Sequence, residues 1–135
     1  MQAQAVQKCG EETLYATAEQ EAEWVREVIR RTYGRVGKHV DVLGGECDVC
    51  EVVEAVAKKK RILVIDSIQT AYVDDVKADC GSNTQLNAVA NYLTSFAKVE
   101  KCAVLAIGHL NKKGEIAGPE LMLHLFDTLV RIDYD

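Results

Sequence analysis

Apolar residues recur with two different spacings along the chain, and the two spacings alternate. Short strand-like runs lie at residues 13–16, 39–43, 61–65, 102–108 and 128–132. Between them, apolar residues three and four positions apart predict amphipathic helices at residues 18–31, 48–59, 82–99 and 119–126. Strands that alternate with helices in this way form a parallel sheet with helices on both faces. The pattern therefore predicts an α/β fold.

Local signals predict where the first of these helices begins and ends. Thr17 is suited to cap it, and Gln20, three residues later, completes a capping box. Gly34 is suited to end it, because glycine readily takes the left-handed conformation of a helix C-cap. Residues 2–8 read as the remainder of another helix, which Gly10 ends.

Length and composition describe one ordinary globular domain. The net charge of −5 argues against a surface that binds nucleic acid by bulk positive charge, so any such contact would have to be local. No apolar run approaches the roughly 20 residues of a membrane span, and the first residues lack the pattern of a secretory signal. The five cysteines are an odd number in varied contexts. They favour reduced thiols and a cytoplasmic location over a disulfide framework.

Cys47 and Cys50 form a C-x-x-C pair, a spacing that occurs in zinc and redox sites. A tetrahedral zinc site needs four ligands, and no second pair has the spacing to supply them. A thioredoxin-like site would place the pair directly after a strand, whereas this pair flanks the start of a predicted helix. We expect ordinary thiols.

A carboxylate stands at the end of one predicted strand. In RILVIDSIQT (residues 61–70), four apolar residues lead to Asp66, and polar residues follow at once. In open parallel sheets, ligand-binding and catalytic residues usually lie at the carboxyl ends of the strands. An acid placed there can hold Mg²⁺ through bound water beside a nucleotide phosphate, which is the Walker B pattern. An Asp that merely caps a loop or the next helix looks the same, so the motif alone leaves both interpretations open.

A Walker B acid needs a phosphate-binding loop, G-x-x-x-x-G-K-[ST], as its companion. The stretch GRVGKH (residues 34–39) is similar but has two residues rather than four between its glycines, and a histidine replaces Ser/Thr. It also leads into a predicted strand rather than a helix, so we expect an ordinary loop. Either the nucleotide hypothesis is wrong, or the phosphate loop precedes residue 1.

Two stretches together resemble a known family. LVIDSIQT is followed, after one helix and one strand, by IGHLNKKGEIAGPELMLHLFDTLV, and this order resembles the RadA (Sms) family of bacterial DNA-repair proteins. The family's run is similar to GHVTK-G-IAGP-LEH-VDTV, and it is matched in order by His109, Lys112, Gly114, residues 116–119, His124, Asp127 and Thr128.

The resemblance covers nearly the whole chain and implies a RecA-like P-loop ATPase core. It implies ATP and Mg²⁺ as cofactors, and single-stranded or branched DNA as the partner. It also implies a role in recombination, where such an ATPase assists branch migration, and assembly into an oligomer.

The resemblance also implies roles at the nucleotide site. Asp66 would coordinate Mg²⁺, with Ser67 beside it at the cofactor. The family strand that ends in a catalytic glutamate is similar to LYATAEQE here, so Glu19 would orient or deprotonate the water that attacks the γ-phosphate. Without the resemblance, Glu19 reads as a first-turn helix acid favoured by the helix dipole.

Three further residues take roles from the resemblance. His109 would sense the γ-phosphate and pass the signal to the DNA-binding loop, although a histidine after a strand is more often a hydrogen-bonded loop residue. Lys112 and Lys113 would contact DNA, although two lysines in a turn are usually only solvated. His124 and Asp127 read as structural.

The chain departs from the family pattern in several segments. The phosphate loop, the four-cysteine zinc module, the KNRFG segment and the protease-like carboxy-terminal domain do not occur in it, and Gln20 stands at a commonly acidic position. We therefore expect residues 1–135 to be a partial RecA-like ATPase domain, truncated at its N-terminus and inactive alone. Two alternatives are a non-catalytic, self-associating RecA-fold module and another RecA-superfamily ATPase, such as a replicative-helicase core or a clock-type ATPase.

Overall fold

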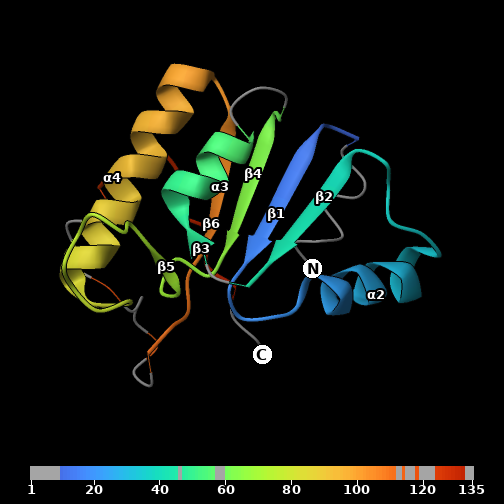
Figure 1. Cartoon of the computed structure of the whole chain (residues 1–135), viewed down its shortest axis with the longest axis horizontal. Coiled ribbons are helices and arrows are strands. Elements are labelled where there is room, and N and C mark those ends of the chain that lie inside the picture. Colours follow the sequence, from blue (N-terminus) through green and yellow to red (C-terminus); the bar gives the residue numbers. More distant parts are fainter. Residues whose placement is uncertain are drawn as a thin grey trace.

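The computed structural model describes residues 10–45, 47–56, 60–111, 114, 118 and 124–132. Within these ranges the four longer strands and the helices between them follow the predicted order, and two short strands, β3 and β5, were not predicted (Figure 1). The elements are β1 (Thr13–Thr17), α2 (Ala22–Tyr33), β2 (Val40–Gly44), β3 (Cys47–Asp48), α3 (Val49–Val56), β4 (Ile62–Asp66), β5 (Ala71–Tyr72), α4 (Asn83–Glu100) and β6 (Ala103–Ile107). None of the helices found in these ranges is both long and apolar enough to cross a membrane.

Four strands form the main sheet, in the order β2-β1-β4-β6, and every neighbouring pair is parallel. The register aligns the carboxyl ends of the strands. Thr17, the last residue of β1, lies opposite both Gly44 and Asp66, and Asp66 lies opposite Ile107. The residues that follow β1, β4 and β6 therefore emerge at one edge of the sheet.

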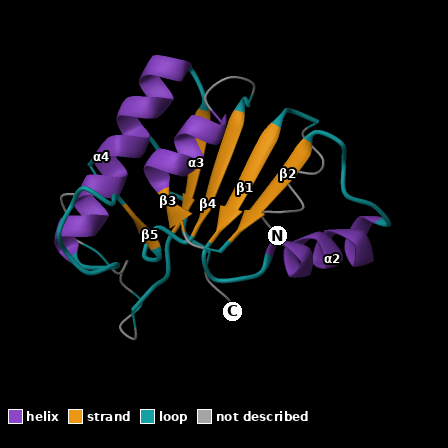
Figure 2. Ribbon diagram, viewed as in Figure 1, coloured by secondary structure: helices purple, strands orange, loops and turns teal. Residues whose placement is uncertain are grey.

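Each face of the sheet packs against helices, which confirms the predicted α/β class. Figure 2 shows α3 and α4 close together over β4 and β6, with α2 beside β1 and β2. The larger core joins α3 and α4 to the sheet, and its fully buried members include Val49, Val52, Leu63, Ile65, Val89 and Leu93. The smaller core joins α2 to the other face through Tyr15, Val25, Ile29, Val40, Val42 and Val64.

β5, which lies between β4 and α4 in the chain, pairs in parallel with β3 and forms a short second sheet. Ser82 caps α4 by accepting a hydrogen bond from the backbone N–H of Gln85. Gln85 itself is almost fully buried. Its side-chain amide donates to the carbonyls of Val73, Val76 and Ala78, and its Oε1 accepts from the backbone N–H of Val73.

The start of α2 differs from the prediction. The helix begins at Ala22 with Glu21 as N-cap, so the capping box of Thr17 and Gln20 is wrong. Thr17 is instead the last residue of β1, buried and paired on both sides, and the chain needs a loop of residues 18–21 to leave the sheet. Glu19 therefore lies in a loop and not in the first turn of a helix. Gly34 ends α2 in the left-handed conformation as predicted.

The carboxy-terminal part also differs from the prediction. Residues 128–132 form no strand, and Leu129, Val130 and Ile132 are exposed. Residues 124–126 are not helical, while residues 119–123 of the predicted helix lie outside the described ranges, as do residues 1–9 and 57–59. β6, predicted to be buried, is partly exposed because it pairs only with β4 in the described part of the sheet.

Candidate functional site

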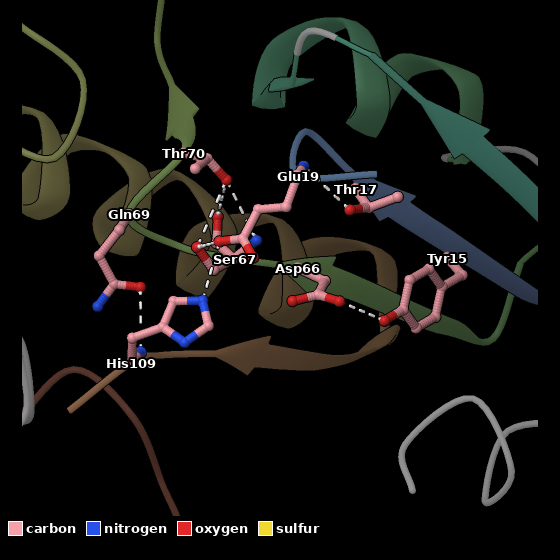
Figure 3. A network of polar contacts seen from close by, with 8 residues as sticks. All are labelled: Tyr15, Thr17, Glu19, Asp66, Ser67, Gln69, Thr70 and His109. Carbon is pink, nitrogen blue, oxygen red and sulfur yellow. Dashed lines mark hydrogen bonds and ion pairs between the residues drawn. The ribbon is translucent and has the colours of Figure 1, made fainter. Parts of the chain in front are cut away.

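Three of the predicted residues converge at the carboxyl edge of the main sheet. Asp66 is the last residue of β4, Glu19 lies in the loop after β1, and His109 follows β6 after a single glycine. Figure 3 shows their side chains directed toward the same space from three neighbouring strand ends. One ligand atom from each of the three lies within 4.8 Å of the others.

Glu19 connects two of the strand ends through hydrogen bonds. Its Oε1 accepts a hydrogen bond of 2.6 Å from the hydroxyl of Ser67. The same oxygen lies 2.9 Å from His109 Nε2. Ser67 is fully buried, whereas the Glu19 and His109 side chains are 33% and 56% exposed. The Ser67 hydroxyl thus fixes Glu19, and both partners of the Glu19–His109 contact remain open to a ligand.

The hydrogen bond from Ser67 has the largest effect on the pKa of Glu19 and lowers it; burial opposes this effect, and His109 lowers the pKa further. Glu19 is therefore ionised at neutral pH. An ionised carboxylate can accept a proton from a water molecule or coordinate a cation.

Asp66 is fixed from the opposite side by a buried tyrosine. Tyr15 lies within β1, and its hydroxyl donates a hydrogen bond to Asp66 Oδ2 (Figure 3). Burial, and then this hydrogen bond, raise the pKa of Tyr15 well above its ordinary value. Tyr15 therefore stays protonated and remains a donor. No other described residue donates to Asp66, so its second oxygen, Oδ1, can accept a ligand.

Backbone contacts hold the loops that carry these side chains. Thr17 Oγ1 accepts from the backbone N–H of Glu19 at 3.2 Å. Thr70 Oγ1 accepts from the backbone N–H of Ser67 and donates to its carbonyl, at 3.2 and 3.0 Å. Gln69 Oε1 accepts from the backbone N–H of His109 at 3.3 Å. Each loop after a strand is thus tied to its own strand end or to the next one.

The side chains present fit a divalent cation. Carboxylate oxygens are the ligands that Mg²⁺ prefers, and Asp66 Oδ1 and Glu19 Oε2 accept no hydrogen bond from a described residue. A triphosphate needs in addition a cradle of backbone N–H groups, and no G-x-x-x-x-G-K-[ST] loop occurs in the sequence. Lys112 and Lys113 lie outside the described residues, so the predicted DNA contact stays a prediction.

Sequence reasoning missed Tyr15 and Thr70. Tyr15 places a polar hydroxyl group within an apolar strand, and a buried hydroxyl group usually needs a hydrogen-bond partner. That signal is present in TLYA, but it does not say which partner is reached. Thr70 lies four residues after Asp66 in a polar stretch, and nothing in the sequence distinguishes it from a solvated residue.

The cysteine pair supplies no ligand atom to this cluster. Cys47 is in β3 and Cys50 is in α3, and both are free thiols. Burial raises the pKa of the Cys47 thiol to about 11. Across the described residues, Glu19, Asp66 and His109 form the only cluster of three or more suitable metal-ligand side chains, and it includes no cysteine.

Curated proteins similar to this chain carry one description in many bacteria. The DNA repair protein RadA of Escherichia coli K12 is 35% identical over 128 residues, which is 91% of this chain. The proteins of the same name from Salmonella typhimurium and Mycobacterium tuberculosis are each 33% identical over 91% and 93% of the chain. The chain belongs to the RadA family. It spans about a quarter of the length of these relatives (26%), and no protein-family model matches it.

Membership of the RadA family confirms the resemblance, and the parallel sheet with helices on both faces is consistent with a RecA-like core.

Proposed function

We propose that this chain is the ATPase core segment of a RadA-type DNA-repair protein. The proposal depends on one structural observation: Glu19, Asp66 and His109 lie close together at the carboxyl edge of a parallel sheet. The relatives of the chain are named DNA repair protein RadA, which agrees with this proposal. The whole protein would act on single-stranded or branched DNA during recombination, with Lys112 and Lys113 as candidate DNA contacts.

Each residue has a role that follows from its environment. Glu19, kept ionised by Ser67, accepts a proton from the attacking water. Tyr15 holds Oδ2 of Asp66 by a hydrogen bond, which leaves Oδ1 to bind the cation. Mg²⁺, when bound with ATP, neutralises the charge that develops on the phosphates. His109 contacts Glu19 directly and connects the start of the loop after β6 to the catalytic carboxylate, which suits a sensor.

This segment alone is expected to bind ATP weakly and to hydrolyse it at background rates, since it has no phosphate loop in its sequence. Isothermal titration with Mg-ATP tests this expectation, and binding at micromolar concentration would contradict it.

The function itself is tested in a protein of full family length. We would replace the segment of the E. coli protein that aligns with this chain by the chain itself, and measure ATP hydrolysis with and without single-stranded DNA. The chimera is expected to hydrolyse ATP, and Glu19→Gln or Asp66→Asn is expected to reduce the rate by about a hundredfold or more. Glu21→Gln, an exposed acid in the same loop, is the matched control. A folded chimera without activity, or one that Glu19→Gln leaves unchanged, would contradict the proposal.

One observation favours a second candidate, a self-associating module that does not need a nucleotide. In the described part of the sheet β6 pairs on one side only, and Leu105 at its centre is 44% exposed. An open, uncharged strand edge is suited to pair with another chain.

A further inference from the structure

The ligand set at the sheet edge has a chemical character of its own. It consists of two carboxylates and one imidazole, from Glu19, Asp66 and His109, with ligand atoms all within 4.8 Å of one another. We propose that these three side chains together bind a divalent first-row transition-metal ion directly and without nucleotide. This goes beyond the proposed function, in which Asp66 alone serves Mg²⁺ beside ATP.

The spacing of the ligand atoms is close to that of a formed site. Two ligands about 2.1 Å from one ion lie roughly 3 to 4 Å apart. Glu19 Oε1 and His109 Nε2 are already 2.9 Å apart. Asp66 is the last residue of a central strand, paired on both sides through β1 and β6, so the rigid part of the sheet supplies one ligand. The three ligand atoms lie within 4.8 Å of one another, so the side chains of Glu19 and His109 must rotate to bring all three onto one ion.

The imidazole decides the class of metal. Oxygen ligands alone suit Mg²⁺ and Ca²⁺, whereas two oxygens with one imidazole suit Mn²⁺, Fe²⁺, Co²⁺ or Zn²⁺. Binding replaces the contact between His109 and Glu19, because Nε2 then coordinates the ion and the imidazole carries its proton on Nδ1. Three protein ligands leave further positions on the ion for water or a phosphate oxygen.

Outer-shell hydrogen bonds favour such a site. Ligand orientation in metal centres depends on partners that hold the carboxylate or imidazole from behind. Tyr15 holds Asp66 Oδ2, and Ser67 holds Glu19 Oε1, so each carboxylate keeps one oxygen without a described hydrogen bond. Both donors are buried, at 6% and 0% exposure, and therefore keep their positions when an ion enters.

Mn²⁺ is the probe of choice because its free form gives an electron paramagnetic resonance signal that is lost on binding. It also avoids thiols, and the exposed Cys80 would bind Zn²⁺. We expect one Mn²⁺ per chain in the absence of nucleotide. Asp66→Asn, Glu19→Gln and His109→Gln should each weaken binding at least about tenfold, and Tyr15→Phe about tenfold. The controls, Glu21→Gln and His124→Gln, alter exposed residues of matching type and should leave affinity unchanged.

The same experiment separates this inference from the proposed function. Circular dichroism of each variant establishes that it is folded, and the mild variants His109→Gln and Tyr15→Phe keep the test decisive if one carboxylate variant unfolds. Absence of Mn²⁺ binding, or binding that all three ligand variants leave intact, overturns the inference. ATP hydrolysis by the chimera with Mg²⁺ would still stand in that case. Conversely, Mn²⁺ binding in an inactive chimera would support the metal site and remove the ATPase assignment.

Discussion

Asp66 and Glu19 are two carboxylates at one sheet edge, and different hydroxyl groups hold them. Asp66 accepts a hydrogen bond from Tyr15 on the neighbouring strand β1, and Glu19 accepts one from Ser67, the residue that follows Asp66. Each hydroxyl fixes one oxygen and leaves the other toward the shared space. The two acids are therefore oriented by groups with no direct access to a ligand, and removal of either hydroxyl should change the site without removing a ligand.

Tyr15→Phe tests the first of these hydroxyl groups. The substitution keeps the buried ring and removes only the hydrogen bond to Asp66, so the free energy of unfolding should fall by about 1.5 to 3 kcal/mol, as for a hydrogen bond to a charged group. Urea denaturation measures this change. Tyr33→Phe is the control, because the Tyr33 ring packs in the same core. Equal effects of the two substitutions would show that the Tyr15 hydroxyl does not stabilise the site.

Ser67→Ala tests the second hydroxyl through its pH dependence. The pKa of Glu19 is lowered in the folded chain. Its hydrogen bonds therefore add stability above the unfolded-state pKa of about 4.3, and this stability is lost as the pH falls through the lower folded-state pKa. The substitution should cost about 1 to 2 kcal/mol at neutral pH and less in acid.

Urea denaturation of the Ser67 variant at neutral pH and at acidic pH measures how its cost in stability changes with pH. Ser82→Ala is a matched control, because Ser82 accepts a hydrogen bond from an uncharged backbone N–H and its loss should cost the same at both pH values. A cost of Ser67→Ala that does not depend on pH would contradict the role given to Glu19.

At the scale of the elements, the carboxyl end of β2 positions the loop that carries Glu19. A Cβ added at Gly44 would lie 3.0 Å from Ala22 Cα and from the carbonyl oxygen of Gln20, and closer still to the backbone nitrogen of Ala22. All three are backbone atoms, so they cannot rotate away. The loop and the start of α2 must move if this glycine is replaced.

Gly44→Ala should therefore lower the free energy of unfolding by about 1 to 3 kcal/mol and weaken Mn²⁺ binding by displacing Glu19. Urea denaturation and the Mn²⁺ titration measure the two effects. Gly108→Ala is the control for stability, since its added Cβ would meet only side-chain atoms at 3.6 and 3.8 Å. If the Gly44 variant is as stable as the Gly108 variant, the loop of residues 18–21 can accommodate the added methyl group, and the prediction is wrong.

Gln85 holds the segment between β5 and α4. Its amide satisfies three backbone carbonyls and one backbone N–H in a nearly fully buried position. Gln85→Ala leaves these groups without their partner, so we expect a loss of about 2 to 3 kcal/mol in the free energy of unfolding. Thermal and urea denaturation measure it. Asn91→Ala, on the exposed side of α4, should cost at most about 0.5 kcal/mol, and a similar loss in both variants would contradict this account.

The elements show which features sequence can predict. Strands β1, β4 and β6 and the helix α4 follow from apolar periodicity, because burial of one face imposes that spacing. The start of α2 could not be predicted in this way. Thr17 has the side chain of a typical N-cap, but in the structure it is the last residue of β1. Residues 128–132 have the composition of a strand but form none, since a strand also requires a neighbour that the local sequence does not reveal.

At the scale of the whole molecule, the site could be predicted only in part. Parallel topology places the ends of strands at one edge, so Glu19, Asp66 and His109 could be expected near one another once the order β1-β4-β6 is known. The contacts of Tyr15 with Asp66 and of Ser67 with Glu19 join residues 51 and 48 positions apart. Such pairs depend on register and side-chain direction, which no local pattern encodes.

The same topology leaves one side of β6 open in the described sheet. The segment CAVLAIG carries no charge, and Ala103 and Leu105 are exposed. Natural edge strands usually carry a lysine, a proline or a bulge that prevents pairing with another chain. We therefore predict that the chain self-associates through β6.

Leu105→Lys should shift the chain toward monomer, because a charge at the centre of β6 must be desolvated when a second strand pairs with it. Sedimentation velocity over a range of concentrations measures the shift. Val28→Lys introduces the same charge on α2, away from β6 (Figure 1), at a residue of similar exposure, 38% against 44%. It should leave association unchanged, because α2 contributes nothing to the open edge. A chain that is monomeric at every concentration, or an oligomer that only Val28→Lys dissociates, would show that β6 is not the contact.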